Sequence, residues 1–333
     1  MDALSDVLKA VRLTGAVFFD VRAAAPFVAE APSSADLAGR VIPGAQHLVH
    51  YHVVSEGSVW GGLHDEPDVH LTAGDIIVFP HGDAHVLSSA PGMRAAPNLS
   101  MFQRGTSPLP FVYEMGGGGE DRVRVVCCFL GCDERPYNPL LTALPRVIHL
   151  SARGPSATGW LGTLFNVAVT ESGAARPGGE NILARLSELM FVEMIRQHLE
   201  SLPAAQTGWL AGLGDPVVGK ALSAMHAEPS ADWTVDGLAR QCGVSRSVFA
   251  ERFTAMVGQP PMQYLALWRA QLASHLLADG GHVAEVAAAV GYESEAAFSR
   301  AFKKLVGRAP AAWRREAAER RASERSESKA GLR

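Results

Sequence analysis

The sequence lacks the features of secreted, membrane-spanning or disulfide-stabilised proteins. Its 333 residues include only 4 cysteines, too few for a disulfide framework. It contains no run of 18 apolar residues that would span a bilayer, and its first residues have neither the charged nor the apolar segment of a signal peptide. We therefore expect a soluble cytoplasmic protein.

The sequence also lacks the excess of positive charge typical of nucleic-acid-binding proteins, since its formal net charge is −4. The charge is unevenly divided, however. Residues 215–333 hold 16 Lys and Arg against 13 Asp and Glu, a balance of +3, whereas residues 1–214 hold 14 against 21, a balance of −7. This asymmetry predicts two domains with different tasks, and the chain is long enough for both. The modest balance of +3 predicts weak nonspecific DNA binding and a need for dimerisation or clustered charge.

One pattern occurs twice near the C-terminus. Ser-x3-Phe-x3-Phe-x3-Val-Gly-x2-Pro begins at Ser245 and again, 49 residues later, at Ser294. Each copy follows a stretch with apolar residues at three- and four-residue intervals, residues 234–242 and 282–290, and a glycine ends each stretch. The glycine closes one helix and the serine caps the next. Each copy therefore predicts a helix-turn-helix, one unit used twice.

The second helix of each copy has an apolar face, which carries the phenylalanines, and an outer face left for a partner. Arginine and lysine pair with guanine edges or phosphates, and glutamate accepts a hydrogen bond from cytosine. The candidate DNA-binding residues are Arg246, Ser247, Ala250, Glu251 and Arg252 in the first copy and Glu295, Ala296, Ser299, Arg300, Lys303 and Lys304 in the second. The second copy is predicted to be the stronger reader, because Ala250 and Glu251 are weak or repulsive partners for DNA. The first copy is expected to position the domain through its two arginines.

A helix predicted over residues 262–279 joins the two copies. At 1.5 Å per residue it spans on the order of 25 Å, so one rigid helix can hold the two readers near successive major-groove faces, about 34 Å apart. Residues 215–316, with both copies of the pattern and the segment Gly-Tyr-Glu-Ser at 291–294, resemble the DNA-binding domain of the AraC family of bacterial transcription regulators. The resemblance implies an all-α double helix-turn-helix that binds double-stranded operator DNA, with base-reading residues among the outer-face residues named above.

Residues 15–130 follow a different pattern, with short apolar or alternating runs separated by Pro, Gly, Ser and Asp. This pattern is typical of a small β-sandwich or barrel. Residues 74–85 resemble the second motif of cupins, Gly-x5-Pro-x-Gly-x2-His, and residues 54–60 resemble the end of the first. The resemblance implies a jelly roll. The whole chain resembles AraC-type regulators that carry a cupin sensor, which implies an effector-binding and dimerising N-terminal domain.

Histidines are concentrated in this region, where 7 of the 12 in the chain lie between His47 and His85. His50 and His52 are two residues apart, so on a strand they share one face. The histidine of the second cupin motif, His85, is expected to approach them, and His81 lies near the mouth of the barrel. His50, His52, His81 and His85 are therefore the candidate effector-binding residues.

Three interpretations of the histidines remain open. They line a small-molecule pocket or are satisfied in the core; they hold a structural or regulatory zinc or iron ion, with His50, His52, His85 and Cys127 as ligands; or they hold a catalytic metal. A complete enzyme site is missing, because His50 stands where cupin enzymes carry a metal-binding glutamate and residues 43–46 replace the upstream His-x-His. No cofactor is therefore required, and zinc or iron is a candidate.

Two helices are predicted between the sensor and the DNA-binding domain, over residues 161–171 and 181–202. The apolar stripe of the second helix is broad, so it must bury more than one side. Two roles remain open for it: packing on the barrel, or a dimer interface, as the family resemblance implies.

The sequence thus predicts an α+β protein of two domains, a cupin-like β-barrel (jelly roll) with dimerisation helices followed by an all-α double helix-turn-helix. The predicted organisation is an effector-binding barrel over 1–150, a helical dimerisation segment over 151–207, a linker over 208–214, the DNA-binding domain over 215–316, and a charged, disordered tail over 317–333. We expect a sequence-specific transcription regulator rather than an enzyme. Its expected partners are operator DNA, a small-molecule effector and a second copy of itself, with RNA polymerase as a further candidate. The alternative is a cupin-type metalloenzyme, a dioxygenase or isomerase, fused to a DNA-binding module.

Overall fold

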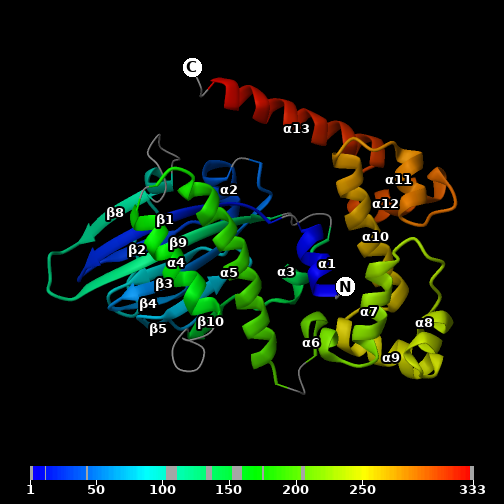
Figure 1. Ribbon diagram of the computed structural model, residues 1–333, viewed down its shortest axis with the longest axis horizontal. Helices are drawn as coiled ribbons and strands as arrows, with labels where there is room; N and C mark the ends of the chain where they lie inside the picture. The colour runs from blue at the N-terminus through cyan, green and yellow to red at the C-terminus, as the bar shows by residue number, and fades with distance from the viewer. Residues whose placement is uncertain are drawn as a thin grey trace. The chain divides into compact units, whose positions relative to one another are not determined.

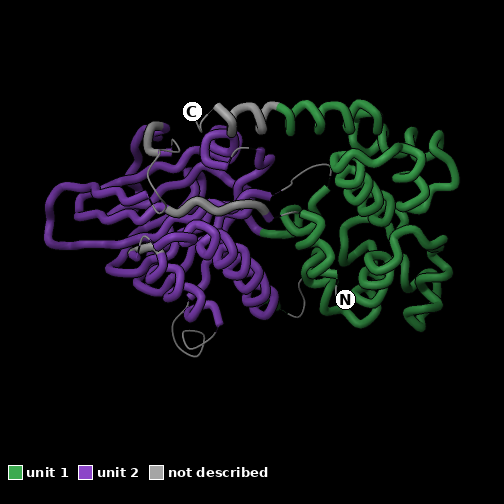
Figure 2. The backbone as a smooth tube through the Cα atoms, turned by 45° about the horizontal axis from the view of Figure 1, so that its top comes forward, with its two compact units in different colours: residues 1–12, 134–144, 202–333 green, residues 13–133, 145–201 purple. Residues whose placement is uncertain are grey.

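The computed structural model describes the chain outside residues 1–2, 12, 43, 103–110, 133–136, 152–159, 175, 204–206 and 331–333. It divides into two compact units, coloured separately in Figure 2. One unit contains residues 13–133 and 145–201, and the other contains residues 1–12, 134–144 and 202–333. None of the helices in the described ranges is long and apolar enough to cross a membrane.

The first unit is built around two β-sheets (Figure 1). The larger sheet has six strands in the order β10-β6-β3-β9-β1-β8, and the smaller has four in the order β2-β7-β4-β5. Strands far apart in the sequence are neighbours in both sheets, as in a jelly roll. The strands are β1 (Thr14–Ala24), β2 (Val28–Ala31), β3 (His47–Glu56), β4 (Ser58–Leu63), β5 (Val69–Thr72), β6 (Asp75–Phe79), β7 (His85–Ser88), β8 (Phe111–Gly116), β9 (Arg122–Cys132) and β10 (Ile148–Ser151).

The turn between β6 and β7 shows why the second cupin motif needs its glycine. Gly82 has a φ of +61°, a conformation that side chains rarely adopt. A Cβ at this position would lie 2.4 Å from the Cβ of Ser34 and 2.5 Å from the carbonyl oxygen of Leu48. The backbone amide of Ser34, in turn, donates to the Gly82 carbonyl oxygen at 2.7 Å. This tight packing fixes the start of β7, where His85 stands.

Helices complete the first unit. The pair predicted from the sequence is present as α4 (Trp160–Ala174) and α5 (Gly179–Ser201), and α2 (Ser34–Val41) and the short 3-10 helix η1 (Leu99–Phe102) lie between strands. Helix α5 contacts β1, β9 and β10 of the larger sheet. The hydroxyl groups of Tyr51 and Ser187 are 2.6 Å apart and buried, so a polar contact ties α5 to β3. At least one side of α5 therefore packs on the barrel.

The second unit consists only of helices. They are α1 (Ala3–Ala10), α3 (Pro139–Ala143), α6 (Trp209–Gly214), α7 (Val218–Ala227), α8 (Val235–Cys242), α9 (Arg246–Val257), α10 (Pro261–Ala278), α11 (Val283–Ala289), α12 (Glu295–Val306) and α13 (Pro310–Ala330). The repeated sequence forms two helix-turn-helix units, α8–α9 and α11–α12, joined by α10. The predicted fold class, a sheet-rich cupin region followed by an all-α double helix-turn-helix, is confirmed.

The serine caps of the reading helices are the ones that the repeat predicts. Ser245 accepts a hydrogen bond from the backbone amide of Val248, and Ser294 accepts one from Ala297. Gly258 and Gly307 end the two helices in the left-handed conformation. Identical caps at matched positions make the two scaffolds equivalent.

Three segments differ from their predicted roles. The expected linker forms α6, because Trp209 is buried and its indole N–H donates to the Tyr264 hydroxyl at 2.9 Å. The charged tail continues the last helix to Ala330, since Arg, Glu and Ala are strong helix formers. Residues 1–12 and 134–144, expected in the barrel, belong to the all-α unit, where α1 contacts α7 and α3 contacts α6.

Candidate DNA interface and effector pocket

The reading helix of the second helix-turn-helix, α12, presents free basic side chains. Its apolar face is buried, with Phe298 and Phe302 at the centre of a cluster that includes residues of α10 and α13. On the outer face, Arg300, Lys303 and Lys304 are exposed. No carboxylate in the described parts of the chain pairs with any of these three cations. They are therefore available for phosphates and base edges.

The remaining predicted residues of α12 lie on the same outer face. Glu295 and Ala296 are exposed in its first turn, and Ser299 is half-buried. The N-terminal residues of a recognition helix are the ones that approach base edges. Position alone therefore makes Glu295 and Ala296 candidates for base contact, and the basic residues follow one turn later.

In the first helix-turn-helix, both arginines of the reading helix are engaged within the protein. The Arg246 guanidinium is 2.9 Å from Oδ2 of Asp236 in α8. The Arg252 guanidinium donates two hydrogen bonds to Oδ2 of Asp215, at 3.0 Å from Nε and 2.6 Å from Nη2. The arginines expected to position the domain on DNA thus have acidic partners that a phosphate must displace.

Asp215 holds its arginine more firmly than Asp236 does, because further hydrogen bonds from the backbone fix its carboxylate. Its other oxygen, Oδ1, accepts hydrogen bonds from the backbone amides of Val217 and Val218, each at 2.9 Å. Burial disfavours the charged carboxylate, but the bonds from Arg252 and the two amides outweigh burial, so the pKa of Asp215 is lowered. The pair consequently joins the start of α7 to α9 and holds Arg252 within the scaffold.

The outer face of α9 offers little to DNA besides these arginines. Ser247 and Glu251 are exposed, and Ala250 is half-buried. A carboxylate at Glu251 repels the phosphate backbone, and a methyl group at Ala250 has no hydrogen-bonding atom. The predicted asymmetry between the two readers is therefore present in the placement of their side chains.

Helix α10 sets the distance between the readers. Its 18 residues correspond to a length of about 27 Å. Tyr264 and Trp268 lie in the N-terminal half of α10 and are fully buried. Phe253 of α9 contacts the Tyr264 ring. Farther along α10, Ala270 and Leu277 belong to the hydrophobic core of the second helix-turn-helix, α11–α12. One rigid helix thus serves as the core of both helix-turn-helix units.

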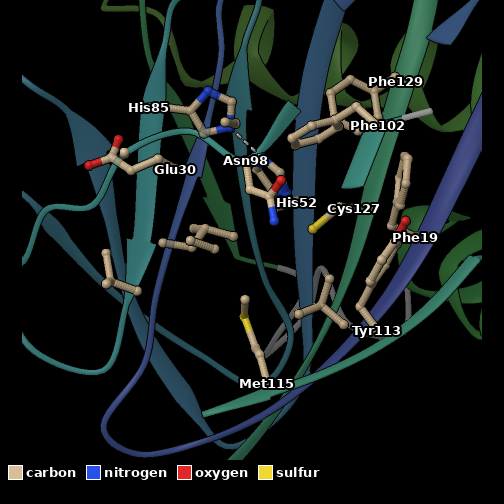
Figure 3. A pocket seen from close by; sticks show the side chains of 16 residues that line it. Phe19, Glu30, His52, His85, Asn98, Phe102, Tyr113, Met115, Cys127 and Phe129 are labelled. Carbon is tan, nitrogen blue, oxygen red and sulfur yellow. Dashed lines mark hydrogen bonds between the residues drawn. The ribbon is translucent and has the colours of Figure 1, made fainter. Parts of the chain in front are cut away.

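The sensor unit contains a cavity of about 250 Å³ (Figure 3). Its walls come from both sheets and from residues 96–102, and most of the lining is apolar. The lining residues are Phe19, Val21, Val28, Ala29, Glu30, Ala31, His52, His85, Leu87, Ala96, Asn98, Phe102, Tyr113, Met115, Cys127 and Phe129. Of the predicted effector residues, His52 and His85 line this cavity, whereas His50 and His81 do not.

The two cavity histidines are in contact across the barrel. Nε2 of His52 lies 2.6 Å from Nε2 of His85, as the dashed line in Figure 3 marks. Nδ1 of His85 lies 2.8 Å from the carbonyl oxygen of Asp83, which can only accept a hydrogen bond. Burial lowers the pKa of His85 to about 4 and lowers that of His52 well below its usual value, so both rings are neutral at physiological pH.

His50 is a core residue on the same strand face as His52. It is fully buried, and its ring contacts the rings of Phe129 and His85. Burial, followed by the neighbouring His85 and His52, lowers its pKa well below the usual value. Neither ring nitrogen has a hydrogen-bond partner among the described residues. His81 is half-buried within the β6–β7 turn.

The histidines do not complete a metal site within the described residues. No group of three or more His, Cys, Asp or Glu side chains there is arranged to hold a metal ion, whereas zinc sites use three or four protein ligands. Cys127 lines the cavity next to His52 on the paired strand. Burial raises the pKa of the Cys127 thiol, so it carries its proton and is a poor ligand. A zinc or iron ion therefore remains a prediction that rests on two imidazoles.

Comparison with known proteins identifies both halves of the chain. A cupin family model matches residues 2–200, and a helix-turn-helix domain model matches residues 238–316. A putative AraC-like transcription regulator of Streptomyces lividans is 36% identical over 255 residues, which cover 75% of this chain and 81% of the relative. The HTH-type transcriptional regulator AlkR of Acinetobacter baylyi is 33% identical over 279 residues, 82% of this chain and 89% of the relative.

The chain belongs to the AraC-type transcription regulators. A solved structure of the DNA-binding domain of AdpA in complex with a target DNA is also similar to part of this regulator. It is 30% identical, covers 33% of this chain and 98% of that chain, and has a TM-score of 0.31. The predicted function, a DNA-binding transcription regulator with an N-terminal cupin domain, is confirmed, and the fused metalloenzyme is not favoured.

Most of the cavity lining in this regulator was not predictable from the sequence. The aromatic residues Phe19, Phe102, Tyr113 and Phe129 line the cavity, but they come from four separate segments with no shared motif. The cupin motif marked His85, and strand alternation from His50 marked His52. The aromatic lining residues could be found only from the strand register of the larger sheet, in which Phe19 of β1 pairs with Phe111 of β8 and Cys127 of β9.

Proposed function

We propose that this AraC-type regulator binds a small-molecule effector in the cavity of its cupin domain, and that the effector controls operator binding by a homodimer. The observation that supports this proposal is the cavity between the two sheets. Ligand pockets are concave, largely apolar and equipped with few polar groups, and the cavity has about 250 Å³, three phenylalanines and one imidazole pair.

We also propose that the cupin domain is not an enzyme. The residues aligned with the metal-binding positions of cupin enzymes are incomplete, with His50 at the position of the glutamate and residues 43–46 in place of the His-x-His. His50 is also buried in the core and does not line the cavity. A cytoplasmic location and contact with RNA polymerase remain predictions that follow from transcription regulation.

The helices α4 and α5 support the homodimer. Exposed large apolar residues recur at seven-residue intervals on each helix, Trp160 and Val167 on α4 and Ile182 and Leu189 on α5, with 45–60% of each residue accessible. Seven residues are about two turns, so each pair lies on one helix face. Exposed apolar residues of this size gain free energy when a second copy covers them.

The dimer proposal is tested by light scattering after size-exclusion chromatography. We expect the wild type to elute as a dimer and the double variant Ile182→Asp/Leu189→Asp as a monomer. Val112→Asp is the matched control, because Val112 is equally exposed, at 54%, on β8 outside these helices. A monomeric wild type, or a double variant that stays dimeric, contradicts the proposed interface.

Chain continuity supplies a route from the cavity to the DNA-binding unit. Strands β1 and β9 are neighbours, and both line the cavity, through Phe19 and Phe129. In the sequence, β1 follows α1 directly, and β9 leads into residues 134–144. Both flanking segments pack inside the all-α unit. A ligand that moves these two strands therefore acts on segments anchored to α6, α7 and α10.

Tyr137 is the firmest of these anchors. Its backbone amide donates to the side-chain carbonyl oxygen of Gln271 at 2.9 Å, and its hydroxyl accepts a hydrogen bond from Gln259 at 3.0 Å. Its ring also contacts the edge of Tyr264, 6.2 Å between centroids. Gln271 and Tyr264 are residues of α10, the helix shared by both readers. A displacement of Tyr137 is thus transmitted to α10.

The function is tested with operators obtained by genome-wide mapping of bound sites. Operator affinity of the purified full-length protein is measured by fluorescence anisotropy, with and without members of a metabolite panel. We expect at least one compound to change the affinity. The cavity-filling variant Ala29→Phe should bind the operator normally and lose the response. A response that survives in Ala29→Phe, or turnover of a metabolite, contradicts the proposal.

The coupling route has its own test. Tyr137→Phe and Gln259→Ala remove the Tyr137 hydroxyl contact, and we expect either variant to weaken the effector response severalfold while operator affinity without effector stays within about twofold. Gln263→Ala is the control, because Gln263 is an exposed glutamine four residues after Gln259, in the first turn of α10. A full response in both variants contradicts this route.

A further inference from the structure

The lining of the cavity defines the size and polarity of its ligand. No Lys or Arg is among the 16 lining residues, so a carboxylate or phosphate has no counter-charge there. An apolar cavity of roughly 150 Å³ holds benzene. By the same ratio, about 250 Å³ holds a molecule on the order of ten non-hydrogen atoms.

The aromatic lining favours an aromatic ligand. Phe19 contacts Phe129 edge to face at a centroid distance of 5.5 Å and stacks near Tyr113 at 5.8 Å. Phe102 contacts both Phe19 and Phe129, at 5.7 and 5.8 Å. Figure 3 shows these four rings together on one side of the cavity, opposite Glu30. Edge-to-face and offset contacts of this kind extend readily to one further ring.

The carboxylate in the lining, Glu30, is in contact with two groups of the protein. Its Oε1 accepts a hydrogen bond from the backbone amide of Ala95 at 3.0 Å, and its Oε2 lies 2.8 Å from Nε2 of His64. A cationic ligand therefore competes with His64 for this group. Because no Lys or Arg lines the cavity and Glu30 already contacts Ala95 and His64, the cavity suits a neutral molecule.

The imidazole pair specifies the polar group of the ligand. Because Nδ1 of His85 donates to the Asp83 carbonyl, the neutral ring leaves Nε2 of His85 as an acceptor. Nε2 of His52 then carries the hydrogen shared between the rings. This tautomer leaves Nδ1 of His52 without hydrogen, and that nitrogen is buried with no partner in the described chain. A buried acceptor without a donor is unfavourable, and a ligand donor relieves it.

We propose that the cavity takes a small neutral phenol, whose ring packs among the phenylalanines and whose hydroxyl donates to the imidazole of His52. This assignment rests on the proposed function, because it names the effector class for the same cavity. A hydrocarbon of equal size fills the cavity but leaves Nδ1 of His52 unpaired. An aromatic acid brings a charge that the lining does not neutralise.

Binding of three matched probes to the full-length protein tests the assignment. 4-Ethylphenol, 4-ethyltoluene and benzoate each have nine non-hydrogen atoms and differ in the polar group, and isothermal titration calorimetry at pH 7.5 measures their affinities. We expect 4-ethylphenol to bind at least tenfold more tightly than 4-ethyltoluene, which corresponds to about 1.4 kcal/mol, and benzoate to show no binding. Equal affinities for the phenol and the toluene, or tighter binding of the benzoate, overturn the proposal.

Variants locate the preference on His52. His52→Leu should bind the phenol and the toluene equally, because it removes the acceptor, and the control His70→Leu, an exposed histidine on β5, should keep the wild-type preference. If His52→Leu fails to fold, Ala29→Phe replaces it and should abolish binding of both probes. A preference that survives in His52→Leu, or in Ala29→Phe when that variant is used, contradicts the assignment. Stoichiometric zinc or iron that is lost in His52→Leu also overturns it, because the imidazoles then serve a metal.

Failure of the phenol assignment is distinguishable from failure of the proposed function. If 4-ethylphenol binds but leaves operator affinity unchanged, the ligand class stands and the effector role of the cavity fails. If the operator response to another compound is lost in Ala29→Phe while 4-ethylphenol does not bind, the effector role stands and the ligand class fails.

Discussion

The two helix-turn-helix units of this regulator have the same scaffold and different outer surfaces. Both reading helices begin at a capping serine, bury two phenylalanines and end at a left-handed glycine. In the first unit, Arg246 and Arg252 are paired with Asp236 and Asp215. In the second, Arg300 and its two lysine neighbours have no such partners in the described chain. A duplicated scaffold thus conserves its caps and core positions, while the surface of each copy is set by its own charges.

The largest expected effect is the loss of operator affinity on removing the free cations of α12. Arg300→Ala and Lys303→Ala should each reduce affinity by about 5- to 150-fold if they contact bases, corresponding to about 1–3 kcal/mol. If a residue contacts phosphate instead, its variant should also reduce the slope of log affinity against log salt by about one. Anisotropy titrations at several salt concentrations measure both. Unchanged affinity in both variants contradicts the role of α12 as the stronger reader.

The next largest expected effect is a gain in operator affinity from a substitution on α9, the reading helix predicted to be weaker. Glu251→Arg replaces an exposed carboxylate on α9 with a cation, and should raise operator affinity severalfold and steepen the salt dependence. Glu228→Arg, an exposed change of equal charge at the end of α7, is the control for net charge alone. An equal gain in both variants means that α9 does not lie against DNA.

A smaller effect distinguishes a structural role of Arg252 from a role in DNA contact. Arg252→Ala should lower the free energy of unfolding by about 1 kcal/mol, because Asp215 loses a partner, with the half-exposed arginine limiting the loss. Operator affinity should change by less than about twofold. Urea unfolding and anisotropy measure the two quantities. Arg246→Ala breaks a pair with two exposed partners and should cost less. A large loss of affinity with unchanged stability would place Arg252 on DNA.

The smallest effect is the pH dependence of the same pair. The pKa of Asp215 is lower in the folded protein than the value near 3.9 typical of an unfolded chain. Its pairing therefore stabilises the fold above that value, and the stabilisation is lost as pH falls through the folded pKa. The difference in Tm between wild type and Arg252→Ala should be constant above about pH 5 and shrink below about pH 4. A difference that grows on acidification has the wrong sign for this pair.

The predictability of the DNA-binding half from the sequence has a physical basis. Helix periodicity, capping serines and terminal glycines act over a few residues, so the repeat predicted both helix-turn-helix units and the outer faces of α9 and α12. The engagement of Arg252 was not predictable, because Asp215 lies 37 residues away. The expected linker likewise became α6 through the contact of Trp209 with Tyr264, which lies 55 residues farther along the chain.

The sensor half was predictable in kind but not in detail. The cupin motif predicted the jelly roll and His85, and alternation along β3 predicted His52. Alternation also placed His50 on the same face as His52, although His50 lies deeper, against Phe129, and does not reach the cavity. Strand period fixes which face a side chain takes, while its depth along the barrel depends on the neighbouring strands.

The sequence by itself determined the two domains, the family and which reading helix carries more positive charge, because motifs, caps and charges are local properties. Only the tertiary structure decided which arginines are free, which histidines meet, and which aromatic rings form the cavity. These outcomes depend on strand register and helix packing between residues that are tens of positions apart, and local sequence carries no record of such distances.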